Sequence, residues 1–456
     1  MRRNPATGEP LPEVEPHTDE QVDAALDRAT ARFDSWSARP MHERRELLAT
    51  AADVLRANKE EYAGLMTREM GKPISGARAE VEKCAWGCEH YAEKAPEYLQ
   101  DEVIGTEPHA KTYVTHEPLG PVLAVMPWNY PFWQVFRFAA PALTAGNVGL
   151  LKHASNVPEC ALAIEEVFRE AGYPEDAFQT LLVGSEKVGD IIADDRVRAA
   201  TLTGSEPAGR AVGQTAGKAL KPSVLELGGS DPFIVLDDAN VEAAARVGAT
   251  ARTQNSGQSC IAAKRFIVHT DVYEAFVEAF VAAVESLTVG DPMAEETDVG
   301  PQAREDLLED LHEQVTASVA AGATVETGGE PLDREGYFYP PTVLTDVPLD
   351  SPLGCEEVFG PAAAVFEVES EAEAIELAND AELGLGAAIF TDDLDRGERL
   401  TKEIESGAVF VNQLTKSDPR LPFGGIKDSG YGRELAAQGI KAFVNEKTVW
   451  IQEAED

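Results

Sequence analysis

The sequence predicts an α/β protein built on parallel sheets. Short apolar segments alternate with helical segments from residue 148 to residue 227, which is the pattern of a parallel α/β sheet. A second alternation begins at Pro232 and continues to Val411. The 456 residues exceed one ordinary hydrophobic core, so we expect two or three domains. In such sheets, ligands bind at the carboxyl ends of the strands.

Helices open the chain. Thr18-Asp-Glu-Gln21 has the pattern of a capping box, and apolar residues follow it at helical spacing. Two further helices are expected over residues 41–70 and 74–95, the first of them ended by Gly71 and Pro73.

Strands follow these helices. Residues 111–117 alternate in strand fashion, and a turn leads into an apolar strand over residues 122–126. The last strand, residues 448–452, could pair with residues 111–117 or with another subunit. Between them we expect strands over 148–152, 178–183, 199–203, 222–227, 232–236, 265–268, 362–366, 387–390 and 408–411, and helices over 158–172, 186–194 and 206–217.

Acidic residues dominate the charge of the chain. It has 80 Asp and Glu against 39 Lys and Arg, a formal net charge of -41. The acids are spread along amphipathic segments, as in residues 13–27, instead of being gathered in a tail. A solvated acidic surface stays soluble in concentrated salt and predicts a halophilic host. It argues against nucleic-acid binding, because nucleic acid is itself an anion.

The sequence indicates a cytoplasmic protein without a membrane partner. No apolar run approaches the roughly 20 residues of a membrane span, and the N-terminal residues lack a signal-peptide core. Five cysteines are few and odd in number, which favours a reducing compartment. Cys84 and Cys88 share one helix face and are interpreted as packing residues, since no further ligands with zinc-site spacing accompany them.

Two residues in the middle of the chain could carry out covalent catalysis. Cys260 follows a polar loop that contains Gly257, and a thiolate is a strong nucleophile. Glu226 lies between leucines, where burial would raise the pKa of its carboxyl group. Together they could form and then hydrolyse a thioester. By itself, a free cysteine is more often a packing residue.

Polar residues also follow several strands. Asn129 comes directly after the apolar strand, where its side-chain amide could donate a hydrogen bond to an oxyanion. Lys152 ends another strand, in a position for a phosphate or a ribose. Thr203-Gly-Ser-Glu-Pro-Ala-Gly209 could bring backbone amides to a pyrophosphate, although it lacks the usual dinucleotide-binding glycine spacing.

The motifs of the chain occur in a characteristic order. They are Pro127-Trp-Asn129, Lys152, Thr203-Gly-Ser205, Glu226-Leu-Gly-Gly229, Gly257-Gln-Ser-Cys260, Glu357-Val-Phe-Gly-Pro361, Asn412 and Pro422-Phe-Gly-Gly-Ile-Lys-Asp-Ser-Gly430. This ordered set resembles the aldehyde dehydrogenase superfamily over nearly the whole chain. The separation of Glu226 and Cys260, 260 - 226 = 34, is also typical of that family. Residues 150–154, 227–232 and 263–265 look like the succinate-semialdehyde dehydrogenase branch.

The resemblance implies a fold and a division of the chain. The expected fold has a Rossmann-type cofactor domain formed by residues 1–98 and 118–227. Residues 228–430 would form an α/β catalytic domain, and residues 99–117 and 431–456 a small β element for oligomerisation. A homodimer or homotetramer is therefore expected.

The resemblance further implies a mechanism. Cys260 would attack an aldehyde carbon, and Asn129 with the Cys260 backbone amide would hold the oxyanion while a hydride leaves for a nicotinamide ring. Glu226 would then activate water against the thioester. The implied reaction is the NAD(P)-dependent oxidation of an aldehyde to its acid, without a metal. Succinate semialdehyde is the expected substrate, and another short aldehyde is the alternative.

NAD or NADP is the implied cofactor. Lys152 and Glu357 would hold ribose hydroxyls, Ser205 and Gly204 the pyrophosphate, and Phe359 and Leu227 the nicotinamide end. The other expected cofactor contacts are Pro127, Trp128, Ser155, Gly184, Gly189 and Thr203. Ser155 stands where many NAD-specific members carry a glutamate, so NADP could bind and dual use stays open.

The expected substrate contacts depart from the pattern of the branch. Arg137 matches an arginine that contacts the succinate-semialdehyde carboxylate in relatives, but Gln254 replaces the second such arginine. Recognition of a carboxylate would then rest on Arg137, with help from Ser417 or Arg420. Trp133 and Phe423 complete the expected set.

Two other interpretations stay open. A cysteine hydrolase or amidase would need a histidine oriented on Cys260, and the nearest in sequence is His269, on an expected strand. A structural, enzymatically silent relative would tolerate the loss of Cys260 or Glu226, yet both are present.

Overall fold

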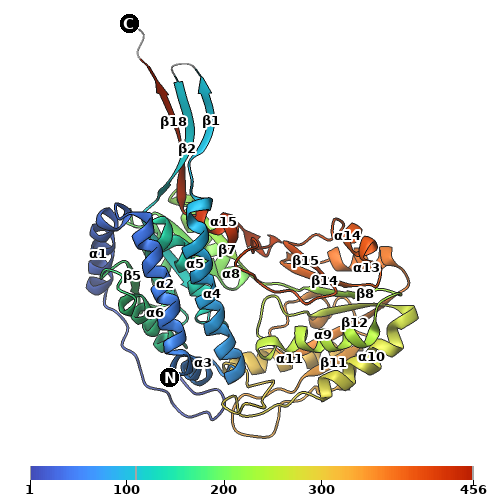
Figure 1. The fold of residues 1–456 in the computed structure, drawn as a ribbon. Coiled ribbons are helices and arrows are strands. Elements are labelled where there is room, and N and C mark those ends of the chain that lie inside the picture. The colour runs from blue at the N-terminus through green and yellow to red at the C-terminus, as the bar shows by residue number, and fades with distance from the viewer. Residues whose placement is uncertain (1, 108–109, 454–456) are drawn as a thin grey trace.

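The molecule consists of two lobes and a projecting arm (Figure 1). The computed structural model describes residues 2–107 and 110–453. One lobe contains a six-stranded sheet, and the other contains a seven-stranded sheet. Both sheets are mainly parallel, which confirms the α/β fold expected from the sequence.

The six-stranded sheet has the order β17-β7-β6-β3-β4-β5, and β17 is its antiparallel strand. Apolar side chains from these strands and from the surrounding helices form one continuous core. The strands are β3 (Pro121–Met126), β4 (Val148–His153), β5 (Phe178–Thr180), β6 (Ala199–Thr203), β7 (Ser223–Glu226) and β17 (Gly430–Tyr431). The helices are α1 (Asp19–Ser37), α2 (Met41–Ala57), α3 (Lys59–Met70), α4 (Ile74–Tyr98), α5 (Trp133–Ala145), α6 (Pro158–Glu170), η1 (Ser185–Lys187), α7 (Val188–Ala193), α8 (Glu206–Lys218) and α15 (Ala436–Lys441).

The seven-stranded sheet has the order β10-β11-β12-β9-β8-β14-β15, with β10 antiparallel to β11. Its strands are β8 (Pro232–Val235), β9 (Arg265–His269), β10 (Thr324–Thr327), β11 (Thr342–Thr345), β12 (Ala362–Val368), β14 (Gly386–Phe390) and β15 (Ala408–Val411). Its helices are α9 (Val241–Thr253), η2 (Gln254–Gly257), α10 (Thr270–Glu285), α11 (Glu305–Ala321), α12 (Pro352–Cys355), α13 (Glu371–Asn379) and α14 (Leu394–Leu400). Phe233 packs in the core with α9 and α10, whereas its neighbour Ile234 packs in the core with α13. Helices therefore cover both faces of this sheet.

The arm is a three-stranded antiparallel sheet that extends away from the body (Figure 1). It contains β1 (Glu102–Glu107), β2 (Ala110–Pro118) and β18 (Val444–Gln452). The pairing of β18 with β2 confirms the expected pairing of the C-terminal strand with residues 111–117. A separate two-stranded ribbon joins β13 (Leu383–Gly384) to β16 (Ile426–Lys427).

The N-terminal helices confirm one expectation and correct another. The Thr18 hydroxyl accepts a hydrogen bond from the Gln21 amide at 3.3 Å, and the Gln21 side chain accepts one from the Thr18 amide at 2.8 Å. The single helix expected over residues 41–70 is wrong, because the chain leaves helical geometry at Asn58 (φ -105, ψ 19) and forms α2 and α3. Gly71 ends α3 in the left-handed conformation, with φ 79.

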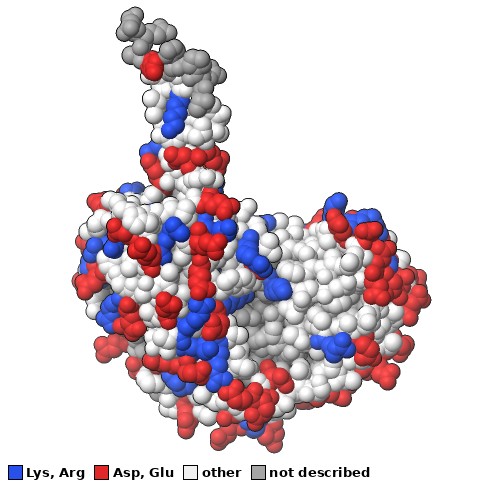
Figure 2. Space-filling view, viewed as in Figure 1, with Lys and Arg blue, Asp and Glu red and all other residues white. Residues whose placement is uncertain are grey.

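Most acidic side chains lie at the surface of the molecule, whereas two of its cysteines lie in the core. Acidic side chains lie around the outline of both lobes (Figure 2). Cys84 and Cys88 are buried in the core on α4, as the packing interpretation requires. In the part of the chain that the structure describes, no helix is long and apolar enough to cross a membrane.

Asn147 fixes the base of the arm, which suggests a test of its stability. Its side-chain oxygen accepts hydrogen bonds from the amides of Leu119 (2.9 Å) and Gly120 (3.1 Å), and its nitrogen donates to the Phe443 carbonyl at 3.1 Å. Because Asn147 is fully buried, Asn147→Ala should lower the free energy of unfolding by about 3 kcal/mol. Urea denaturation would measure this, with the exposed Asn445→Ala as control. Equal stability of the two variants would contradict the prediction.

Candidate active site

A cleft of about 370 Å³ lies where the carboxyl ends of β3, β6 and β7 meet the loop before β9. The parallel strands explain the meeting, since their carboxyl ends share one edge of the sheet. Among the residues that line the cleft are many of those selected from the sequence: Pro127, Trp128, Asn129, Thr203, Gly204, Ser205, Leu227, Cys260, Glu357 and Phe359. The structure thus brings these residues together.

A sharp turn presents Cys260 to the cleft. Asn255, Ser256 and Gly257 have successive positive φ angles of 54, 56 and 75. The Asn255 side chain holds the turn by donating to the Gln258 carbonyl at 2.9 Å and to the Asn129 carbonyl at 2.8 Å. The cysteine loop is therefore tied directly to the segment that carries Asn129.

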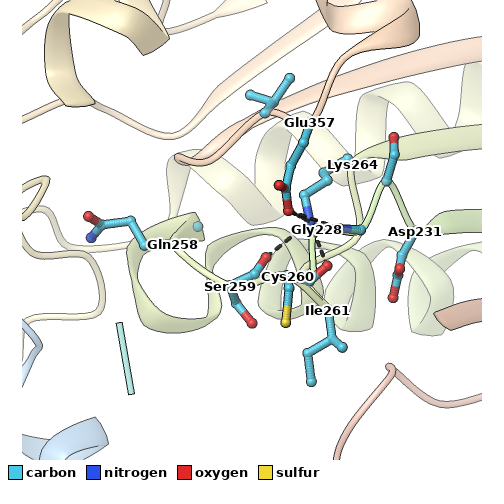
Figure 3. A network of polar contacts seen from close by, with 12 residues as sticks. Gly228, Asp231, Gln258, Ser259, Cys260, Ile261, Lys264 and Glu357 are labelled. Carbon is cyan, nitrogen blue, oxygen red and sulfur yellow. Dashed lines mark hydrogen bonds and ion pairs between the residues drawn. The ribbon is translucent and has the colours of Figure 1, made fainter. Parts of the chain in front are cut away.

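Lys264 holds the same loop through two further hydrogen bonds (Figure 3). Its Nζ donates to the carbonyls of Ser259 (3.0 Å) and Cys260 (2.7 Å) and lies 3.8 Å from Oε1 of Glu357. Figure 3 shows the Cys260 sulfur pointing away from this network. The sequence interpretation missed Lys264, because a lysine four residues after a cysteine carries no signal of its own.

Two contacts orient the amide of Asn129. Its Nδ2 donates to the Gln258 carbonyl at 3.1 Å, and its Oδ1 accepts a hydrogen bond from Nε2 of Gln134 at 3.1 Å. These partners determine which end of the amide is the donor. Nδ2 keeps a second hydrogen for another acceptor. Gln134 also lines the cleft, and it was not selected from the sequence.

Burial controls the protonation of Cys260 and Glu226. It raises the pKa of the Cys260 thiol to about 12, although the positive charges of Lys264 and Arg137 lower it. Burial, together with the nearby Glu434 carboxylate, raises the pKa of Glu226 well above its ordinary value. Neither Glu226 oxygen has a hydrogen-bond partner within the described residues. Burial therefore favours the neutral form of both groups.

Glu226 itself lies outside the lining of the cleft. It ends β7 one residue before Leu227, which does line the cleft. One of its carboxylate oxygens instead lies next to Gly424.

The expected substrate contacts fall into separate groups. Arg137 is buried, forms an ion pair with Glu434, and lies with its guanidinium 4.6 Å from the ring centre of Phe423. Trp133 donates from Nε1 to the Ser417 hydroxyl at 3.1 Å. Gln254 instead donates to the backbone carbonyls of Ala251 and Ile261 and joins neither group.

A second cavity, of about 210 Å³, lies at the carboxyl ends of β4 and β5. Ser155 and Gly184 line it. Lys152 is buried at the end of β4, and its ammonium has no ion pair within 4 Å among residues 2–107 and 110–453. Gly189 lies apart, in α7, where a Cβ atom would meet open space.

These features fit a dinucleotide. Ser205 caps α8 without using its side chain, so the amides of the first turn are open to an anion at the cleft. The unpaired Lys152 adds a hydrogen-bond donor between the two cavities. Over the described part of the chain, no cluster of three or more His, Cys, Asp or Glu side chains could hold a metal ion.

The model of the aldehyde dehydrogenase family matches residues 1–449. The chain belongs to the aldehyde dehydrogenase family. A probable succinate-semialdehyde dehydrogenase (NADP+) of Synechocystis sp. is 55% identical over 448 residues, which cover 98% of both chains. A succinate-semialdehyde dehydrogenase (NADP+) of Mycolicibacterium paratuberculosis is 53% identical over 451 residues, covering 98% of this chain and 96% of the other.

Solved structures of similar enzymes superpose closely on this aldehyde dehydrogenase. The succinic semialdehyde dehydrogenase of Streptococcus pyogenes in complex with NADP+ has a TM-score of 0.96 and 38% identity, covering 99% of this chain and all (100%) of the other. PnpE in complex with nicotinamide adenine dinucleotide has a TM-score of 0.96 and 32% identity, covering 100% of this chain and 94% of the other. The expected family and fold are thereby confirmed.

The turn before Cys260 should not tolerate a side chain at Gly257. A Cβ atom there would lie 2.3 Å from the backbone carbon of Gly360, at a φ of +75. Gly257→Ala should therefore lower the free energy of unfolding by about 3 kcal/mol. Gly217→Ala is the matched control, because its Cβ would meet nothing within 4 Å and alanine favours the helix by up to about 1 kcal/mol. Thermal unfolding would measure the difference, and equal melting temperatures of the two variants would contradict the prediction.

Proposed function

We propose that this aldehyde dehydrogenase oxidises succinate semialdehyde to succinate with NADP as its oxidant. The observation that carries the proposal is one cleft lined by Cys260, Asn129 and the open N-terminus of α8. The relatives named as succinate-semialdehyde dehydrogenases (NADP+), at 55% and 53% identity, support the choice of substrate and cofactor. Oxidation of another short aldehyde is the alternative.

The reaction begins with the sulfur of Cys260. Because burial raises the pKa of its thiol to about 12, the thiol must lose its proton to a base before or during attack on the aldehyde carbon. The Asn129 amide and the Cys260 backbone amide then donate hydrogen bonds to the developing oxyanion. The bound nicotinamide supplies a hydride acceptor, and the sulfur is left in a thioester.

Hydrolysis of the thioester needs a second proton acceptor. Glu226 takes a proton from a water molecule, which attacks the acyl carbon and releases the acid and the Cys260 thiol. The raised pKa of Glu226 makes its carboxylate a stronger base than an exposed one. The nearby Glu434 carboxylate raises the pKa of Glu226 further, while the positive charges of Arg137 and Arg433 lower it.

The remaining selected residues have roles in binding. Lys152, Ser155 and Gly184 would hold the adenosine half of the cofactor, with Ser155 near its 2'-phosphate, and Gly189 in α7 would lie further away. Trp128, Leu227, Glu357 and Phe359 lie toward the nicotinamide half. Trp133, Arg137, Ser417 and Phe423 would contact the substrate, whereas Gln254 would only support the backbone nearby. Residues 1–98 and 118–227 would form the cofactor domain and residues 228–430 the catalytic domain. Residues 99–117 and 431–456 would form the oligomerisation element.

We also infer the setting of the enzyme. The arm exposes large apolar side chains, namely Val103, Ile104, Trp450 and Ile451, which favours a homodimer or homotetramer formed through it. A net charge of -41 suits the cytoplasm of a halophilic host. Activity that rises with salt and a mass of two or four chains in light scattering would support this setting.

Steady-state kinetics test the substrate and the cofactor together. Succinate semialdehyde should have a higher kcat/KM than butanal, and NADP a higher kcat/KM than NAD. Turnover by Cys260→Ala should be lost. Full turnover by that variant would contradict a covalent role of Cys260 in either reaction, whereas thiol alkylation that stops a nicotinamide-independent hydrolysis would favour the cysteine hydrolase. His269 gives that rival no support, since its Nδ1 accepts a hydrogen bond from the Asp271 amide at the start of α10.

Glu226→Gln should separate the two halves of the reaction. The variant should produce a burst of reduced cofactor near one equivalent and then slow by about 100-fold, because the acyl group stays on Cys260. In the wild type, the pKa of Glu226 is raised, so thioester hydrolysis should rise with pH as the carboxylate form appears. The exposed Glu93→Gln is the control. Stopped-flow absorbance that shows no burst in Glu226→Gln would oppose this role.

Ser155→Glu tests the preference for NADP. A glutamate in the second cavity would repel the 2'-phosphate, so kcat/KM with NADP should fall by about ten-fold or more. The value with NAD should change less, because NAD lacks that phosphate. Ser155→Ala is the matched control and should keep the preference. An unchanged NADP to NAD ratio in Ser155→Glu would mean that residue 155 lies away from the 2' position.

A further inference from the structure

Lys83 lies in a cluster beside the expected substrate contacts, although it was not selected from the sequence. It projects from α4, and its Nζ donates to the Ser417 hydroxyl at 2.7 Å. The same Nζ lies 4.7 Å from the ring centre of Trp133, whose Nε1 donates to Ser417 at 3.1 Å. We call Lys83, Trp133 and Ser417 the Lys83 cluster.

The charge of Lys83 has no partner. No carboxylate of residues 2–107 or 110–453 lies within 4 Å of its ammonium, whereas the neighbouring cation Arg137 is paired with Glu434. Lys83 is also half-buried. An enclosed cation without a counter-ion is costly, so the site favours an anion.

The Ser417 hydroxyl points to the same kind of ligand. Its oxygen accepts one hydrogen bond from Lys83 and one from Trp133, which uses both of its lone pairs. Its own hydrogen has no acceptor in the described part of the chain. Ser417 is 8% exposed, so solvent reaches it poorly. An ammonium and a hydroxyl that both lack an acceptor match the two oxygens of a carboxylate.

Arg137 connects the Lys83 cluster to the surroundings of the reacting sulfur. Trp133 and Arg137 are four residues apart on α5, about 6 Å along the helix. The charge of Arg137 acts on both Cys260 and Lys83, so Arg137 lies near both groups. A short chain with an aldehyde at Cys260 could therefore place its other end at the Lys83 cluster.

We propose that Lys83 binds the carboxylate of the substrate and so determines the preference for an acidic aldehyde. This inference rests on the proposed function. It also explains how the chain manages without a second arginine: Gln254 donates to backbone carbonyls and Arg137 is neutralised by Glu434, so Lys83 supplies the missing positive charge.

The charge of Lys83 should depend on pH. Burial and the positive charge of Arg137 lower its pKa to about 8, while Glu80 and Cys84 on α4 and Asp418 on the facing loop raise it. The ammonium is present below that pH and is lost above it. A carboxylate bound through Lys83 should therefore bind less well as the pH rises from 7 to 9.

Lys83→Met and Lys83→Arg test the proposal in the full-length enzyme. With NADP in excess, Lys83→Met should raise the KM for succinate semialdehyde by about ten-fold or more, with a smaller change in kcat. The kinetics with butanal, which has no carboxylate, should stay close to wild type. Lys83→Arg should keep the preference. Lys94→Met, also on α4 but exposed to solvent, is the matched control and should behave as wild type.

The ratio of kcat/KM for succinate semialdehyde to that for butanal distinguishes a failure of the proposed function from a failure of the proposed role of Lys83. A wild type without any preference for succinate semialdehyde would overturn the proposed function itself. A wild type with the preference, retained in Lys83→Met, would overturn only the role of Lys83. Should Lys83→Met fold poorly, the pH series decides. The ratio should fall between pH 7 and 9 in the wild type and stay level in Lys83→Arg, and a level wild-type ratio would refute the inference.

Discussion

The hydrogen bonds between the Asn129 segment and the cysteine loop are the constraint on which the site depends. Asn255 donates to the carbonyl of Asn129, and Asn129 donates to the carbonyl of Gln258. These two bonds join the six-stranded lobe to the loop that enters the seven-stranded lobe. The nucleophile and the amide beside it are thereby held together by backbone geometry, independently of any ligand.

Buried charge is arranged in neutral sets around this constraint. Lys264 lies near Glu357, and Arg137 is paired with Glu434, so each cation near the sulfur has a nearby carboxylate. Burial raises the pKa of both Glu226 and Cys260, which favours their neutral forms. Cys260 and Glu226 are thus the groups that exchange protons during the proposed reaction, while the paired charges around them change little.

Apolar patterning predicted most of the central strands but missed β11, although all four of its residues are buried. The strands at 122–126 and 232–236 were expected, because continuous apolar runs form central strands. The exposed β10 and the short β17 gave no such signal. Asn58 broke a helix whose apolar spacing continues past it, so the pattern alone could not locate the break. Ordered motifs located most of the residues that line the cleft, but not Arg304 or Leu307. Gln134, Lys264 and Lys83 were missed because tertiary contacts give them significance; Lys83 meets a residue 334 positions away.

The free edge of β18 limits how copies of the chain could assemble through the arm. In the sheet order β1-β2-β18, β18 is an outer strand, and its apolar residues Trp450 and Ile451 are exposed. If two copies of this strand joined side by side in antiparallel orientation, a two-fold axis would relate them and the contact would be isologous. Such a contact is complete with two copies. The sheets of the two arms would then form one continuous sheet across the dimer, and this contact would not continue into an open-ended fibre.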